Sequence, residues 1–242
     1  MAERGDERKR QAKLEASVRG LVMNVFEKDK GNPFEAGRKK MEDLNAVVNE
    51  FIIKKEPGDW YQAVLANVGS DKDPYAHATR VSTLAALFSL ALNIGKPAEL
   101  SAAGVFHDIG IASLPVELFR TKEELWTSYE WELFHLHPEL SIKYLKEKKM
   151  ILPGNVEKII IQHHENWDGT GYPKKLNRDK IIMEAQLLRV ADEFDYLTRY
   201  EAKKKVMKPI EAIKDIQRRN IVNPAITNSL AVMFEEGEKN IE

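Results

Sequence analysis

Cysteine is absent from this chain of 242 residues, so neither a disulfide framework nor a thiolate metal site can form. An excess of positive charge is also missing: 37 Lys and Arg against 38 Asp and Glu give a net charge of −1, which argues against a protein that binds duplex nucleic acid. No stretch approaches the ~18 consecutive apolar residues of a membrane span, and the opening MAERGDERKR lacks the apolar core of a signal peptide. We therefore expect a soluble cytosolic protein with no membrane contact and no duplex nucleic-acid partner.

Histidine is sparse, yet five of the six histidines recur at similar intervals together with two aspartates. The positions are His77, the pair His107-Asp108, His137, the pair His163-His164, and Asp192. The gaps between successive positions are 30, 29, 26 and 28 residues, which is the length of one helix-turn-helix, so a helical bundle could direct all these side chains at one centre. Seven nitrogen and oxygen ligands without sulfur suit two divalent ions such as iron, manganese or zinc. A dinuclear centre is the usual device for displacement at phosphorus.

Helical periodicity dominates the chain, and we find no convincing strand pattern, which predicts an all-α fold. Residues 1–70 contain amphipathic helical patterns after a solvated, disordered start. Because such helices cannot bury their apolar faces alone, this region should pack on the main domain or on a partner chain, as a regulatory or dimer contact. The expected helices of the remainder are 75–94, 97–108, a segment from the capping box of Thr127 and Glu130 toward His137, 139–149, 154–165, 182–205, 209–219 and 224–236, with a loop over 166–180.

As a signal of a metal site, the pair His107-Asp108 is weaker than the pair His163-His164. Neighbours on a helix point about 100° apart, so His107 could hold one metal while the Asp108 carboxylate turns to bridge two. Adjacent imidazoles at a helix end, as in His163-His164, are costly to bury unless they are bound to something, and the preceding Ile159-Ile160-Ile161 implies burial. His135, two residues before His137, should point away from the metals and serve a structural or surface role.

Four strings resemble the HD-GYP family, the all-helical group of HD-superfamily phosphohydrolases that hydrolyse the bacterial second messenger cyclic di-GMP. They are HDIG (107–110), HPELS (137–141), HHENWDGTGYP (163–173) and VADEFDYLT (190–198), in family order and at family spacing. The resemblance covers about residues 71–218. It implies a domain over 71–242 that forms a helical bundle of the HD phosphohydrolase type, with 1–70 as a helical appendage.

The resemblance also implies a role for each residue. His77, His107 and Asp192 would hold the first metal, while His137, His163 and His164 would hold the second and Asp108 would bridge the two. The cofactor would be a pair of divalent ions, iron first and manganese next, bridged by a hydroxide that attacks phosphorus and releases pGpG or GMP. The loop Gly171-Tyr172-Pro173 would shape the mouth of the site and offer a docking surface for a diguanylate cyclase.

Several positions depart from the family pattern. Ile111 stands where the family has a lysine that contacts the substrate phosphate, and the loss of one such donor costs about 10²–10³-fold in rate unless another group replaces it. The segment 201–204 replaces an Arg-Pro-Tyr-Arg sequence, so Lys204 would keep a charge but not the arginine fork. Glycines of the pattern are replaced by Ser141, Lys175 and Arg178. The candidate substrate contacts are Tyr172, Lys174, Lys175 and Lys204, and Asp73 is a candidate third-metal ligand whose short side chain favours two metals.

Three functions stay open on this evidence. The first is a dinuclear-metal phosphodiesterase of cyclic di-GMP, with activity weakened by Ile111. The second is a metal-containing but weakly active or inactive receptor for cyclic di-GMP that signals through protein contacts. A homodimer is a separate expectation. The third is an HD-type enzyme acting on another phosphoester or, with mixed-valence iron, catalysing an oxygenation. A cytoplasmic location in a bacterium is expected for each of them.

Overall fold

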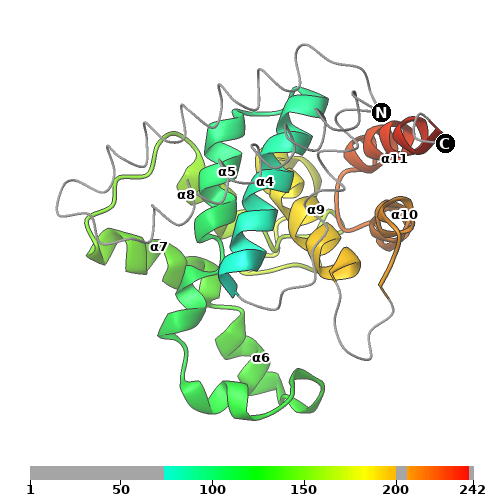
Figure 1. The fold of residues 1–242 in the computed structure, drawn as a ribbon. Coiled ribbons are helices and arrows are strands. Elements are labelled where there is room, and N and C mark those ends of the chain that lie inside the picture. The colour runs from blue at the N-terminus through cyan, green and yellow to red at the C-terminus, as the bar shows by residue number, and fades with distance from the viewer. Residues whose placement is uncertain (1–73, 200–205, 240–242) are drawn as a thin grey trace, which may run out of the picture.

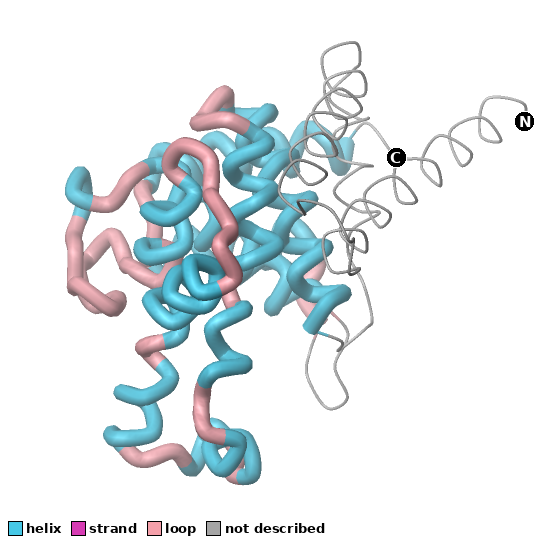
Figure 2. Tube along the Cα trace, turned by 90° about the vertical axis from the view of Figure 1, so that its left-hand side faces the viewer, coloured by secondary structure: helices cyan, strands magenta, loops and turns pink. Residues whose placement is uncertain are grey.

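The computed structural model describes residues 74–199 and 206–239, and every regular element within these ranges is helical (Figures 1 and 2). The all-α prediction is therefore confirmed for the described part of the chain. The expected N-terminal helices, Asp73 and Lys204 lie outside it. The α-helices are α4 (Pro74–Leu92), α5 (Pro97–Phe106), α6 (Ser128–Phe134), α7 (His137–Glu147), α8 (Val156–Gln162), α9 (Met183–Thr198), α10 (Pro209–Arg219) and α11 (Pro224–Lys239), and the 3-10 helices are η1 (Ile109–Ser113), η2 (Val116–Arg120), η3 (Glu123–Leu125) and η4 (Arg178–Lys180).

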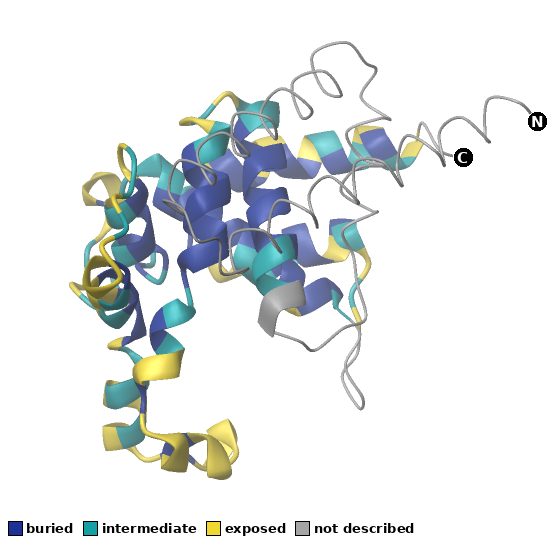
Figure 3. Cartoon of the chain, turned by 60° about the vertical axis from the view of Figure 1, so that its left-hand side comes forward, coloured by how far each residue is buried: buried dark blue, intermediate teal, exposed yellow. Residues whose placement is uncertain are grey.

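The core lies where α4 packs against α5 on one side and α9 on the other (Figure 1). Gly104 of α5 has no Cβ, and a Cβ there would overlap the backbone of Ser82, so the two helices approach closely at this point. Phe88 of α4, Phe194 of α9 and Phe234 of α11 meet with ring centroids 5.4–6.4 Å apart, and all three are fully buried. The apolar helix faces predicted from the sequence thus pack together in one core, whose buried residues are dark blue in the central helices of Figure 3.

Several predicted helices end earlier than expected, and three of these differences, after α5, after α8 and at the end of α9, concern the candidate site. The helix expected over 97–108 stops at Phe106, and the one expected over 154–165 stops at Gln162. Both histidine pairs consequently lie in the turns that follow α5 and α8 rather than inside helices. The helix expected to reach residue 205 ends at Thr198, because Arg199 adopts an extended backbone.

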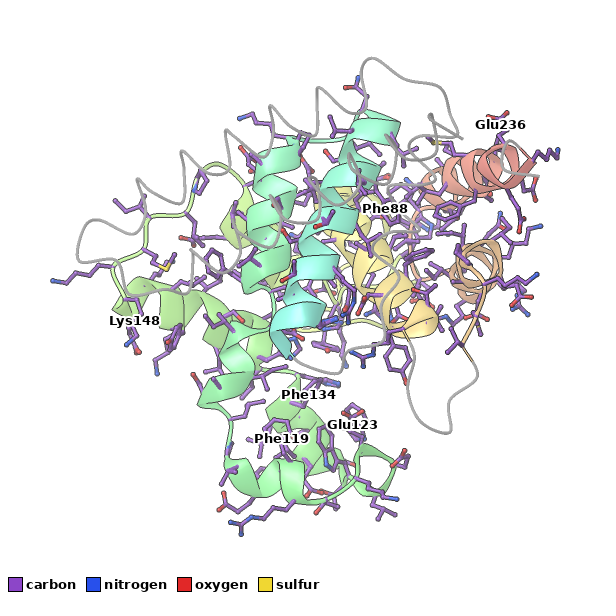
Figure 4. All side chains as sticks on the ribbon, viewed as in Figure 1. Phe88, Phe119, Glu123, Phe134, Lys148 and Glu236 are labelled. Atoms are coloured by element: carbon purple, nitrogen blue, oxygen red, sulfur yellow. The ribbon has the colours of Figure 1, made fainter. Side chains whose placement is uncertain are left out.

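The segment between α5 and α7 forms a lobe that extends away from the core helices (Figures 1 and 3). It has its own small apolar cluster of Leu114, Leu118 and Trp126, with Phe134 packed against it. Figure 4 shows Phe119 and Phe134 within this lobe, far from Phe88 in the core. The capping box predicted from Thr127 and Glu130 is present at the start of α6 and holds the helix that leads to His137.

None of the described helices combines the length and the apolar character that crossing a membrane would require.

Candidate metal centre

All seven predicted ligand residues come together at one end of the core helices. They form two adjacent groups, and within each group the potential ligand atoms lie within 4.8 Å of one another. One group is His77, His107 and Asp192, and the other is Asp108, His137, His163 and His164. The side chains come from the first turn of α4, the turn after α5, the start of α7, the turn after α8 and the middle of α9. Residues separated by up to 115 positions in the sequence therefore share one site.

Asp108 lies between the two groups and directs one oxygen at each. Its Oδ2 is 3.4 Å from His107 Nε2 and 3.9 Å from His77 Nε2, whereas its Oδ1 is 3.2 Å from His137 Nε2 and 3.8 Å from His163 Nε2. This is the arrangement expected of a carboxylate that bridges two cations. Although burial raises the pKa of Asp108, the imidazoles around it lower the pKa by more, so the carboxylate is ionised at neutral pH.

Three of the histidines are oriented by the same local device. The Nδ1 of each donates to the carbonyl oxygen three residues earlier, His107 to Gly104 at 2.8 Å, His137 to Phe134 at 2.8 Å and His163 to Ile160 at 2.6 Å. Each ring follows the last turn of a helix, where the final carbonyls have no intrahelical partner. Because a carbonyl can only accept, Nδ1 carries a proton, and in the neutral ring the lone pair is then on Nε2.

The Nε2 atoms of these three histidines are buried and have no hydrogen-bond donor among the described residues. The Nε2 atoms of His107, His137 and His163 and the Oδ1 of Asp108 receive no hydrogen bond from any described residue. Burial, reinforced by the neighbouring imidazoles, lowers the pKa of His163 well below its usual value, which keeps the ring neutral. Acceptor atoms that face one another at 3.2–3.9 Å cannot satisfy each other, whereas a cation between them would. The donor set of imidazoles and carboxylates thus fits two divalent transition-metal ions.

His77 is oriented by a carboxylate instead of a carbonyl. Its Nδ1 donates to Asp195 Oδ2 at 2.7 Å, and its Nε2 lies 3.4 Å from Asp192 Oδ1. Asp195 is 1% exposed and also accepts from Arg80, whose Nε lies 2.5 Å from Oδ1. A carboxylate behind a metal-binding histidine fixes its tautomer and raises its basicity. Burial by itself lowers the pKa of His77, but the hydrogen bond that His77 donates to Asp195 and the charges of the nearby carboxylates outweigh it and raise the pKa.

His164 differs from the other four histidines of the centre. Its Nδ1 lies 2.9 Å from Arg189 Nη1, and a guanidinium can only donate, so here Nδ1 is the acceptor. Burial, followed by the neighbouring His163 imidazole and the charge of Arg189, lowers the pKa of His164 well below its usual value. The ring is stacked on Tyr172 with centroids 4.7 Å apart. Tyr172 therefore borders the centre, and burial raises the pKa of its hydroxyl, which stays protonated.

The remaining histidine, His135, stacks on the opposite side of Tyr172 at a centroid distance of 3.9 Å and belongs to neither group. The loop that carries Tyr172 is tied down by Glu165, which is fully buried. Its two carboxylate oxygens accept from the backbone N–H groups of Lys174 at 2.7 Å and Leu176 at 2.8 Å. The side chains of Lys174 and Lys175 are exposed to solvent.

Ser141 joins the turn that carries His107 to the helix that begins at His137. Its hydroxyl accepts from the N–H of Gly110 and donates to the carbonyl of His107, both at 2.8 Å. A Cβ on Gly110 would overlap the backbone of His137 and Ser141, so only glycine permits this approach. The half-buried Ile111 follows in the 3-10 helix η1 and adds no charge beside the centre.

Sequence reasoning gave no role to three groups that the fold brings to the centre: Asp195, Arg189 and Glu165. Asp195 and Arg189 lie three residues after and three residues before Asp192, so helical spacing places them on the same face of α9. That spacing was a usable signal. Glu165 carries no comparable signal, because its partners are backbone groups of a loop.

Comparison with known proteins gives a consistent picture. Residues 64–222 match the family model described as HD domain. The 3′3′-cGAMP-specific phosphodiesterase 2 of Vibrio cholerae is 30% identical over 160 residues, which cover 64% of this chain and 30% of that protein. The cyclic di-GMP phosphodiesterase of Thermotoga maritima is 25% identical over 210 residues, which cover 85% of this chain and 56% of that protein. The chain thus spans about a third to a half of the length of these curated relatives.

Among solved structures, Bd1817, an HDG"Y"P protein from Bdellovibrio bacteriovorus, superposes with a TM-score of 0.64 at 23% identity. The match covers 92% of this chain and 70% of that one. At this identity the likeness establishes the shared fold.

Proposed function

The chain belongs to the HD-domain family, within its HD-GYP group, and from this membership we propose that it is a metal-dependent phosphodiesterase of cyclic di-GMP that releases pGpG or GMP. The observation that carries the proposal is the set of buried imidazole Nε2 atoms without a hydrogen-bond partner among the described residues, directed at an ionised carboxylate that faces both ligand groups. Relatives named as cyclic di-GMP phosphodiesterases occur in Thermotoga maritima, Pseudomonas aeruginosa and Borreliella burgdorferi and support this substrate class.

The proposed ligands are His77, His107 and Asp192 for one ion and His137, His163 and His164 for the other, with Asp108 shared. Two divalent ions, iron or manganese, would lower the pKa of a bound water and neutralise the charge of the phosphodiester oxygens. The chain itself contributes orientation: the carbonyls behind His107, His137 and His163, and the carboxylate behind His77, hold each ring in its ligating tautomer. No side-chain nucleophile is needed for this hydrolysis.

A second candidate function is a receptor that binds cyclic di-GMP and turns it over slowly or not at all. Ile111 favours it, because the turn after Asp108 presents an aliphatic side chain where the HD-GYP pattern has a lysine. A diguanylate cyclase bound at the Tyr172 loop, a homodimer and a cytoplasmic location stay predictions.

The test is to incubate the iron- or manganese-loaded full chain with cyclic di-GMP and with 3′3′-cGAMP and to follow linear products by chromatography. Asp108→Asn should abolish product formation and reduce metal content, while Asp215→Asn, a surface change on α10, should leave both unchanged. Binding of the cyclic dinucleotide without product would establish the receptor function. Absence of both binding and product with either metal would refute the proposal.

A further inference from the structure

Arg189 lies against one ligand of each metal group. It precedes Asp192 by one turn of α9, and its Nη1 is 2.9 Å from His164 Nδ1 and 3.7 Å from Asp192 Oδ2. The side chain is 13% exposed, so the guanidinium is largely removed from bulk water. Its Nε is buried and has no hydrogen-bond partner among the described residues. The site thus contains a permanent cation with spare donor capacity beside both groups.

The bond between Arg189 and His164 is incompatible with metal binding by His164. A neutral imidazole has a single ring lone pair, and in this structure the Nδ1 lone pair accepts from Arg189. If Nδ1 gives that pair to a metal, Arg189 has nothing to donate to. If Nε2 binds the metal instead, the proton moves to Nδ1, and Arg189 again loses its acceptor. In either tautomer, metal binding at His164 releases Nη1 of Arg189.

The released guanidinium stays beside the centre because Glu193 holds its other arm. Arg189 Nη2 lies 2.8 Å from Glu193 Oε1, and Glu193 Oε2 lies 2.5 Å from Arg219 Nη2. Glu193 is only 13% exposed, so this pair is shielded from solvent and anchors Arg189 at one edge. A buried guanidinium that has lost an acceptor carries a desolvation cost until it finds another.

We propose that Arg189 is an anion-binding residue of this centre and donates to a non-bridging phosphate oxygen of a phosphodiester once His164 ligates a metal. This inference rests on the proposed function, since it takes the two ligand groups as metal sites. It provides the donor that Ile111 does not provide. The released Nη1 suits a phosphate oxygen, because a hydrogen bond from a permanently charged donor is stronger than one from a neutral donor.

The probe is inorganic phosphate, titrated by calorimetry into the manganese-loaded full chain, with metal content per chain measured on each sample. Arg189→Ala should weaken phosphate binding by about 10- to 100-fold, as expected for lost hydrogen bonds to a charged group, while the metal content stays at the wild-type value. Arg189→Lys should recover part of the affinity, because the charge returns but the planar guanidinium that Glu193 holds in place does not. Arg219→Ala is the matched control, since it removes the other arginine on Glu193 but touches neither ligand group.

Phosphate affinity within twofold of wild type in Arg189→Ala would overturn the inference. So would an equal loss in Arg219→Ala, a loss of metal in Arg189→Ala, or a wild-type protein that holds metal but binds no phosphate. Turnover of cyclic di-GMP, measured in parallel, separates this inference from the proposed function. Wild-type protein without turnover whose phosphate binding depends on Arg189 would refute only the phosphodiesterase, whereas full turnover and phosphate binding in Arg189→Ala would refute only the role of Arg189.

Discussion

Replacing Asp195 by asparagine should weaken the binding of one metal ion and destabilise the fold. The carboxylate accepts from His77 Nδ1 at 2.7 Å and from Arg80 Nε at 2.5 Å, and it is 1% exposed. An amide of the same shape keeps one acceptor oxygen but turns an NH₂ group toward the other donor. His77 then loses the partner that keeps its proton on Nδ1, and its Nε2 lone pair is no longer reserved for a metal.

The magnitude follows from the kind of contact that is lost. Removing a carboxylate behind a metal-binding histidine costs about 10- to 100-fold in metal affinity. Losing one charge-assisted, fully buried hydrogen bond costs about 1.5–3 kcal/mol of unfolding free energy. The effect should be confined to the group of His77, His107 and Asp192, because Asp195 makes no contact with His137 or His163.

Competition with a chelator measures the affinity of each of the two ions, and guanidinium unfolding of the metal-free protein measures stability separately. Asp215→Asn is the control: it weakens the pairs of Asp215 with Arg218 and Arg219, whose side chains are 74% and 39% exposed, and should cost about 1 kcal/mol or less. An Asp195→Asn protein that binds both ions as tightly as wild type would refute the assigned role. Equal weakening of both ions would show a general collapse of the site instead.

Three further outcomes are expected. Ile111→Lys should raise kcat/KM for cyclic di-GMP by about 10-fold or more if a missing phosphate donor limits the rate, and unchanged turnover would place the limit elsewhere. Ser141→Ala should lower the unfolding free energy by about 1–3 kcal/mol in a denaturant titration, since the N–H of Gly110 loses a buried acceptor; a change near zero would contradict this. Burial lowers the pKa of His163 and His164 in the folded state, whereas unfolded histidines bind protons as the pH falls below about 6.5. The metal-free protein should therefore melt at a lower temperature at pH 5.5 than at pH 7.5. The raised pKa of His77 acts in the opposite direction and offsets part of this loss. An equal or higher melting temperature at pH 5.5 would show that these imidazoles are protonated in the folded state.

The sequence alone determined the helical class and which seven residues meet as the two candidate ligand groups. Periodic apolar residues define the core helices because burial of one helical face is a local property of spacing. The near-equal gaps between histidines predicted their convergence, since each helix-turn-helix returns the chain to the same end of a bundle. The capping box at Thr127 was likewise readable, because all its atoms belong to residues three positions apart.

Only the tertiary structure decided how each side chain is oriented. Whether a histidine offers Nδ1 or Nε2 depends on its hydrogen-bond partner, and the partner of His77 lies 118 residues away on α9. The pairing of Arg189 with His164 likewise depends on how α9 packs beside the turn that follows α8, which no local pattern encodes. The predicted ends of the helices that stop at Phe106 and Gln162 were wrong for a related reason. His107 and His163, which follow these helices, each donate a hydrogen bond to a carbonyl of the final turn. This arrangement depends both on local geometry and on the buried site into which the rings point.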